Sequence, residues 1–403
     1  MGWPLVFTNG KTFTEADTEG FNYTGTFPLI AEEMVNEAQT LIAAVGTARQ
    51  LADVMKAGPV ASVRRRGRAL VGVVALDPMD VVLATPVLNS LFRPGFVPES
   101  GAFSRASTGT YFDAGGILRT GASGALRFAS DRSTGENLGA LIEEASTNFL
   151  LQSDTPATRT VSLAAGTYTL WVEGTGSAAL SGGTASGTAT AATPVTFTLA
   201  STTSVTVTVS GTLTRYQLET GSFRSTYIPT TTAAVTRAAD AYQWTLPTDF
   251  WNPTEGTFYL DAVTAPGKAP VNSQFAFEFG DTTTNNRVSV LRQPTGALSV
   301  QVVIGGTVYQ TSPPNSFIPD NTRFRLAFAV AAGGQLNVSL NGDFFTQLSV
   351  PGTALPLATV FRVGDRAGGA RTWNGSILQI GYAQRRLPST YLPLISAVPQ
   401  TVY

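Results

Sequence analysis

Three stretches of this chain set its architecture: FSRASTGTYFDAGGILRT (residues 103–120), GENLGALIEEASTNFLLQSD (135–154) and YQLETGSFRSTYIPTTTAAVTRAAD (216–240). In the first, runs rich in Thr, Tyr, Phe and Ile flank Asp113-Ala114-Gly115-Gly116, which supplies residues that accept positive φ in a tight turn. The pattern predicts a β-hairpin made of residues 107–112 and 117–120.

The third stretch begins within a predicted strand and ends in a predicted linker. Polar and apolar residues alternate over 213–219, as in a strand with one apolar face. Pro229 forces Ile228 into an extended conformation, so the chain leaves the strand extended. Together the three stretches resemble a module of structural proteins of tailed bacteriophages, in which it joins an attachment region to β-rich fibre or spike domains. The resemblance implies a class of protein and no reaction.

Composition narrows the possible functions. The chain has 403 residues, 13% of them charged, a net charge of −1, no cysteine and no histidine. This length predicts two to four domains. The charge balance argues against a nucleic-acid partner, and the lack of histidine excludes a Ser-His-Asp triad or an imidazole-bound metal. No segment has the features of a secretion signal or a membrane helix, so we expect a protein made in the host cytoplasm without membrane insertion.

Residues 1–95 contain the one convincing helix, predicted at about 28–57. Apolar residues there follow the spacing of a coiled-coil seam over three heptads. One interpretation is an amphipathic helix that packs on its own domain, and the other is a short bundle around a symmetry axis, for which a homotrimer would cover the wide apolar stripe. The predicted oligomerisation residues are Met34, Ala38, Leu41, Val45, Ala48, Ala52 and Met55. The arginines of residues 64–68 are interpreted as a solvated turn or as salt bridges to a docking partner.

The remainder of the chain predicts mainly β structure. Residues 96–154 are interpreted as a hairpin linker and residues 155–240 as a small antiparallel β-sandwich. Residues 241–403 predict a second sandwich of jelly-roll type, with strands at 257–263, 274–279, 287–292, 298–304, 307–310, 323–330, 335–340, 344–348, 360–363 and 375–382.

The second sandwich contains TEGTFYLDAV (254–263), RFRLAFAVAAGGQLNVSLNGDFF (323–345) and FRVGDRAGGARTWNGSILQIGYAQRRLPSTYL (361–392). These phrases resemble the concanavalin A-like, laminin-G-like lectin fold. The resemblance bears on fold more than on function.

Few side chains are candidates for chemistry or binding. Glu278 and Asp281 lack the spacing of a glycosidase acid pair, so we predict no catalytic site. Calcium is conceivable but not favoured, because aspartate is an ordinary turn residue; the turn aspartates are Asp281, Asp320, Asp343 and Asp365. Trp251 and Tyr309 are candidate glycan-stacking residues, although aromatic residues of sandwich strands usually lie in the core.

These observations favour a non-enzymatic virion protein of a tailed phage, a homotrimeric fibre or spike. It would contact other virion proteins through residues 1–95 and contribute to host attachment, with a host cell-surface glycan as a candidate partner. The alternatives are a head decoration or neck (collar) fibre, and, from another class, a secreted lectin or a glycan-active enzyme. No cofactor is expected.

Overall fold

The computed structural model describes residues 5–6, 12–13, 88–92, 102–265, 272–369 and 371–397. Within these residues the protein is mainly β, with two antiparallel β-sandwiches, which confirms the predicted fold class. The helix predicted at about 28–57, its seam and the arginine cluster lie outside the described residues. A short pair of strands near the N-terminus, β1 (Leu5–Val6) and β2 (Thr12–Phe13), is antiparallel.

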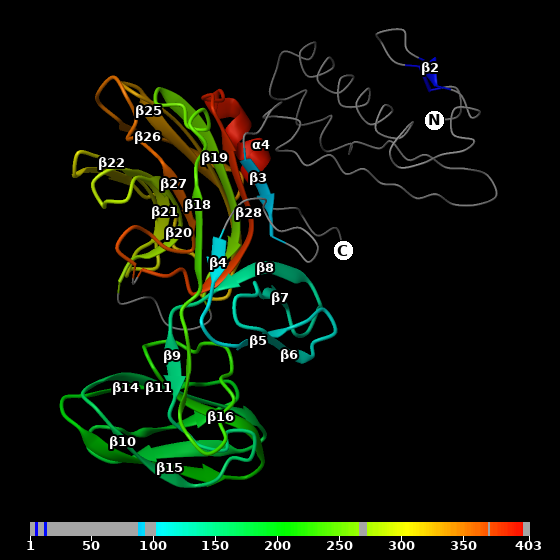
Figure 1. The fold of residues 1–403 in the computed structure, drawn as a ribbon, viewed down its shortest axis with the longest axis vertical. Helices are drawn as coiled ribbons and strands as arrows, with labels where there is room; N and C mark the ends of the chain where they lie inside the picture. The colour runs from blue at the N-terminus through cyan, green and yellow to red at the C-terminus, as the bar shows by residue number, and fades with distance from the viewer. Residues whose placement is uncertain are drawn as a thin grey trace.

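The large sandwich consists, in the described part of the chain, of one seven-stranded and one eight-stranded sheet (Figure 1). The seven-stranded sheet has the order β23 (Thr307–Thr311), β22 (Leu298–Ile304), β21 (Arg287–Arg292), β20 (Gln274–Gly280), β27 (Val360–Val363), β18 (Ala241–Thr245) and β4 (Ala102–Ser104). The eight-stranded sheet has the order β26 (Asp343–Ser349), β25 (Gln335–Leu340), β24 (Arg323–Ala331), β19 (Glu255–Val263), β28 (Gly375–Ala383), β8 (Asn137–Ile142) and β7 (Phe128–Ser130), with β3 (Leu88–Leu91) also paired to β28.

All ten strands predicted between residues 257 and 382 are present, each ending within about two residues of its predicted limits. The turn between β25 and β26 has positive φ at both Asn341 (52°) and Gly342 (91°), as a tight hairpin requires. The 3-10 turn η2 (Ser389–Tyr391) and the helix α4 (Leu392–Ser396) follow, and α4 covers apolar residues on the outer face of β19 and β24.

Aromatic rings fill the core of the large sandwich because alternate residues of both sheets face inward. Phe258 stacks on Phe328 with ring centroids 4.6 Å apart, and Phe279 stacks on Phe361 at 4.4 Å. Trp251 belongs to the same cluster, and its ring lies 5.3 Å from that of Tyr382.

The small sandwich has a four-stranded and a five-stranded sheet in the described residues. The first has the order β10 (Arg159–Leu163), β15 (Thr203–Ser210), β12 (Ser177–Ser181) and β13 (Gly187–Thr190). The second has the order β14 (Val195–Leu199), β11 (Gly166–Gly174), β16 (Leu213–Thr220), β9 (Ser146–Asn148) and β17 (Val235–Arg237). Strands β12 and β13 were not predicted, because Ala and Gly, which are depleted in strands, make up much of their sequence.

The small sandwich is inserted into the large one. Strands β4, β7 and β8 belong to the large sandwich, residues 146–237 build the small sandwich, and β18 returns to the large one. The hairpin of β5 (Gly109–Phe112) and β6 (Leu118–Gly121) is present as predicted and lies between the two sandwiches (Figure 1). The segment 96–154, expected to act as a linker, thus also supplies strands to both sandwiches, and β3 from residues 1–95 joins the large one.

Candidate functional site

The chain crosses between the sandwiches twice, and the two crossings lie side by side. The first runs from β8 to β9 through Glu143, and the second runs from β17 to β18 through Asp240. Strands β9 and β17 pair, and the Asp240 amide donates to the Glu143 carbonyl at 2.9 Å. Hinges between domains consist of a few loop or element-terminal residues. Both crossings are short segments between strands, so the side chains around them bear on how firmly the two sandwiches are connected.

Arg127, which precedes β7, joins both crossings. Its Nη1 donates to Glu143 Oε2 at 2.7 Å and to the Thr110 carbonyl at 2.9 Å. Its Nη2 donates to Asp240 Oδ2 at 2.5 Å. The arginine side chain is fully buried. One guanidinium therefore connects the hairpin and the two crossing segments.

Two further arginines complete the cluster. Arg105 Nη1 donates to Asp240 Oδ1 at 3.0 Å. Arg237 Nη1 lies 3.2 Å from Glu143 Oε2, and its Nη2 donates to the Glu144 carbonyl. We call Arg105, Arg127, Arg237, Glu143 and Asp240 the junction cluster; it holds three positive and two negative charges.

The junction cluster favours the ionised form of Glu143 despite the burial of this side chain. Burial raises the pKa of Glu143, but the charges of Arg237 and Arg127 and the hydrogen bonds from Thr226 outweigh burial and lower the pKa to about 2. Thr226 donates to the carboxylate through both its amide and its hydroxyl, at 2.8 and 2.7 Å. Removing either carboxylate from such a cluster leaves a guanidinium group buried without a compensating charge, which is costly.

The polar face of β16 extends this network into the small sandwich. Glu219 is fully buried and accepts from Trp171 Nε1 at 2.6 Å and from the Ser225 amide at 2.9 Å. Burial raises the pKa of Glu219. Gln217, also fully buried, accepts from the Ile228 amide at 2.6 Å. Residues 216–219 of the alternating segment 213–219 are therefore buried on both faces of the strand, one face in the core and one in the junction.

A second ion-pair group fastens the β7–β8 turn to the small sandwich. Glu173 on β11 accepts from Arg215 Nη1 at 2.8 Å and from Arg224 Nη2 at 3.0 Å. Arg132, in the turn, approaches Glu173 at 3.4 Å. Because these groups are partly exposed, we expect each of these ion pairs to contribute less to the stability of the fold than an ion pair of the junction cluster.

Glycines allow the two turns of the first two stretches to touch through their backbones. Gly116 has φ of 69°, and a Cβ there would lie 2.6 Å from the Arg132 carbonyl oxygen. Gly135 has φ of 74°, and a Cβ there would lie 2.5 Å from the Ala114 carbonyl oxygen. Both the left-handed conformation and the close approach favour glycine.

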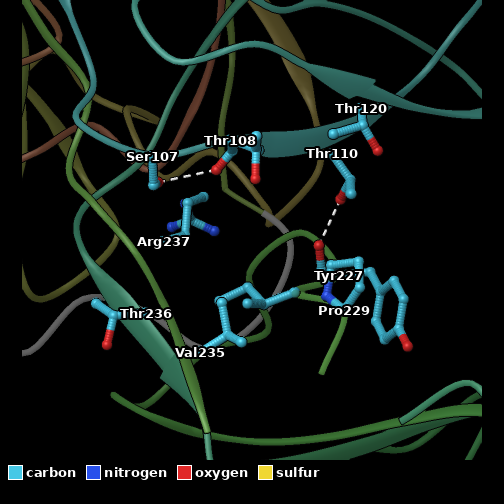
Figure 2. A pocket seen from close by; sticks show the side chains of 11 residues that line it. Ser107, Thr108, Thr110, Thr120, Tyr227, Pro229, Val235, Thr236 and Arg237 are labelled. Atoms are coloured by element: carbon cyan, nitrogen blue, oxygen red, sulfur yellow. Dashed lines mark hydrogen bonds between the residues drawn. The ribbon is translucent and has the colours of Figure 1, made fainter. Parts of the chain in front are cut away.

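A small cleft opens between the start of β5 and the strand β17 (Figure 2). Its volume is about 110 Å³. Ser107 Oγ accepts from the Ala238 amide at 2.9 Å, and Thr110 Oγ1 donates to the Tyr227 carbonyl at 2.5 Å. The cleft is lined by Ser107, Thr108, Gly109, Thr110, Thr120, Tyr227, Ile228, Pro229, Val235, Thr236 and Arg237.

Glu278 lies outside the junction, on the face of the seven-stranded sheet that is turned away from the core. It is fully buried, and its Oε1 accepts from Arg362 Nη1 at 2.8 Å and from the Ala367 amide at 2.9 Å. Burial raises the pKa of Glu278. Asp281 instead accepts from the Thr283 amide at 2.6 Å and from Asn286 Nδ2 at 2.9 Å. The two acids thus serve an ion pair and a turn.

The other residues that the sequence singled out, the aromatic candidates for glycan stacking and the turn aspartates, take part in packing, ion pairs or turns. Trp251 lies in the aromatic core, so its ring is not available as an exposed stacking surface, and Tyr309 packs partly buried against the same core. Asp320 pairs with Arg292 at 2.6 Å, and Asp365 accepts from the Arg366 amide at 2.8 Å. The described residues contain no group of three or more His, Cys, Asp or Glu side chains that could hold a metal ion. Nor does any helix among them have the length and apolar character for crossing a membrane.

No family model and no curated protein matches the chain. Among solved structures, the CBM40 domain of a Ruminococcus gnavus IT-sialidase bound to α2,3-sialyllactose is 15% identical, with a TM-score of 0.31, over 36% of this chain and 84% of that chain. The leech intramolecular trans-sialidase is 16% identical, with a TM-score of 0.32, over 40% of this chain and 26% of that chain. A Streptococcus pneumoniae sialidase is 17% identical, with a TM-score of 0.31, over 38% of this chain and 26% of that chain. The matches thus span only about a quarter of the two sialidase chains.

Proposed function

We propose that this chain is a non-enzymatic structural protein of a tailed-phage particle, a homotrimeric fibre or spike. Residues 1–95 would bind other virion proteins and carry the oligomerising helix. The two sandwiches would project from the particle and contribute to attachment to the host surface. Three copies on one stem would gain avidity even if each bound weakly.

The observation that carries this proposal is the double crossing clamped by the junction cluster. A two-strand hinge between sandwiches would ordinarily bend, but Arg127 ties both crossings and the hairpin together in a buried setting. The residues of the cluster come from the stretches that resemble the phage module or lie between them. A stiff connection suits an appendage that must hold its outer domains at a fixed distance from the particle.

The surroundings of the carboxylates support the non-enzymatic part of the proposal. Glu143 and Asp240 are held by arginines, and Glu278 is fully buried beside Arg362. A general acid or nucleophile of a glycosidase must instead face the substrate across an open cleft.

Labelling of intact particles tests the location. A gold-labelled antibody against the large sandwich should mark an appendage of purified particles, and light scattering of the purified chain should give the mass of a trimer. Label on the head surface or the neck would favour the decoration or collar alternative. A chain recovered only in the medium, as a monomer, would contradict the proposal.

A second candidate function, binding of a surface glycan, is favoured by the cleft between β5 and β17. Its lining is rich in hydroxyl groups, and its single charged residue, Arg237, is buried and ion-paired. Hydroxyl-bearing ligands are recognised by such neutral polar groups beside apolar surface. Retention of the chain on immobilised bacterial polysaccharides, without release of shortened sugars, would support binding. Sugar release would favour the enzyme alternative.

A further inference from the structure

The cleft between β5 and β17 has two walls of different chemistry. One wall consists of Ile228, Pro229 and Val235, and the Val235 side chain is 38% exposed. The other wall carries the hydroxyl groups of Thr108 and Thr120, which make no hydrogen bond within the described residues. Figure 2 shows this arrangement, with Val235 and Pro229 on the side opposite Thr108 and Thr120. A ligand that fits must therefore be apolar on one side and polar on the other.

Charge and size limit the ligand further. Arg237 is the only charged residue of the lining; it is 1% exposed and its guanidinium pairs with Glu143. A neutral ligand is therefore favoured over an ion. A cavity of about 150 Å³ holds a benzene molecule, so the 110 Å³ of this cleft gives room for a group of about four or five non-hydrogen atoms.

We infer that the cleft binds the acetamido group of a 2-acetamido sugar. This group has about four non-hydrogen atoms, a methyl group at one end and an amide at the other, which matches the volume and the two walls. The methyl group would lie against Val235 and Ile228, and the amide would bond the hydroxyls of Thr108 and Thr120. The inference rests on the proposed glycan binding and specifies the part of the sugar that is recognised.

The floor of the cleft is rigid enough to select a ligand. Ser107 and Thr110 are tied to the segment opposite by the bonds to the Ala238 amide and the Tyr227 carbonyl. Below them, Arg237 is fixed by the junction cluster. Preformed walls lower the cost of ordering the site when the ligand enters.

Ligand-observed NMR titration of the full chain tests the inference. N-acetylglucosamine should bind at least about tenfold more tightly than glucose, which lacks the acetamido group. Thr120→Val should weaken that binding by about fivefold through loss of one hydrogen bond. Thr108→Phe, at an exposed position, should fill the cleft and abolish binding. Thr188→Val, an exposed strand threonine of the four-stranded sheet, is the matched control and should bind as the unaltered chain does.

The melting temperature of each variant shows that it is folded. Equal affinity for the two sugars would overturn the inference, as would acetamido-dependent binding that persists in Thr108→Phe. Equal competition by N-acetylvaline amide would assign the cleft to peptides and also overturn it. If bacterial polysaccharides still bind the Thr108→Phe variant, the inference about the cleft fails while the proposed glycan binding stands. If neither N-acetylglucosamine nor any polysaccharide binds the unaltered chain, both fail.

Discussion

Replacement of Arg127 by methionine should loosen the connection between the two sandwiches. Methionine keeps much of the volume of the arginine stem but removes the charge and the donors to Glu143, Asp240 and the Thr110 carbonyl. The remaining cluster then has two positive and two negative charges, with Asp240 paired to Arg105 at 3.0 Å and Glu143 paired to Arg237 at 3.2 Å.

The magnitude follows from what remains paired. Breaking a buried ion pair by removing one partner costs about 3–5 kcal/mol. Because each carboxylate keeps one arginine in Arg127→Met, we expect the lower end, about 3 kcal/mol. Asp240→Ala should cost about 5 kcal/mol, since it leaves Arg105 without a carboxylate partner, leaves one carboxylate for the three guanidinium groups of the cluster, and removes the acceptor of the Glu143 amide.

Urea unfolding followed by circular dichroism measures both effects. With an m-value of about 3 kcal/mol/M for a chain of this size, Arg127→Met should lower the urea midpoint by about 1 M. The matched control is Arg119→Met, which removes an exposed ion pair with Asp113 on the same hairpin and should leave the midpoint nearly unchanged. If Arg127→Met and Arg119→Met unfold at the same urea concentration, the buried cluster does not hold the junction together and the reasoning is refuted.

Four other predictions concern pH, backbone, assembly and metal. The lowered pKa of Glu143, about 2, gives stability that is present above its ordinary value of 4.5 and is lost as the pH falls from 4.5 toward 2. The raised pKa of Glu219 acts in the opposite sense, because stability is lost as the pH rises from 4.5 to the pKa of the folded state. The melting temperature should therefore be highest on the acid side of neutrality and fall toward neutral pH. This fall should be smaller in Glu219→Gln, and an equal fall in the variant would contradict the reasoning. Gly139→Ala should leave little folded protein by circular dichroism, because φ is 91° and the new Cβ would lie 2.1 Å from a backbone oxygen of β28, and a normal melting curve would show that the strand yields. Leu41→Asp with Val45→Asp should give monomers by light scattering, and a persistent trimer would exclude the seam as the assembly contact. A chelator should leave the melting temperature unchanged, whereas a fall of several degrees would indicate a structural cation.

The candidate site was only partly foreseeable. The alternation over residues 213–219 predicted a strand. Glu143 and Glu144 directly follow an apolar run in a chain with few charges, and this pattern was a signal that could have indicated buried ion pairs. The partners of such charges could not be assigned, because they are far apart in the chain: Arg105 and Asp240, for example, are separated by 135 residues. Sequence patterns reflect interactions between residues that are close in the chain. An ion pair between residues this far apart depends instead on where the tertiary structure places whole strands.

Local pattern was enough to establish that the protein is mainly β, where ten strands of the large sandwich run and that a hairpin follows residue 106, since alternation and turn chemistry act over a few residues. Packing over long separations was needed for three other features: the insertion of one sandwich into the other, the burial of Trp251 among core rings, and the meeting of three arginines with two carboxylates. Each of these arises from the desolvation and pairing of groups that are distant in the chain, and no local periodicity records which distant groups meet.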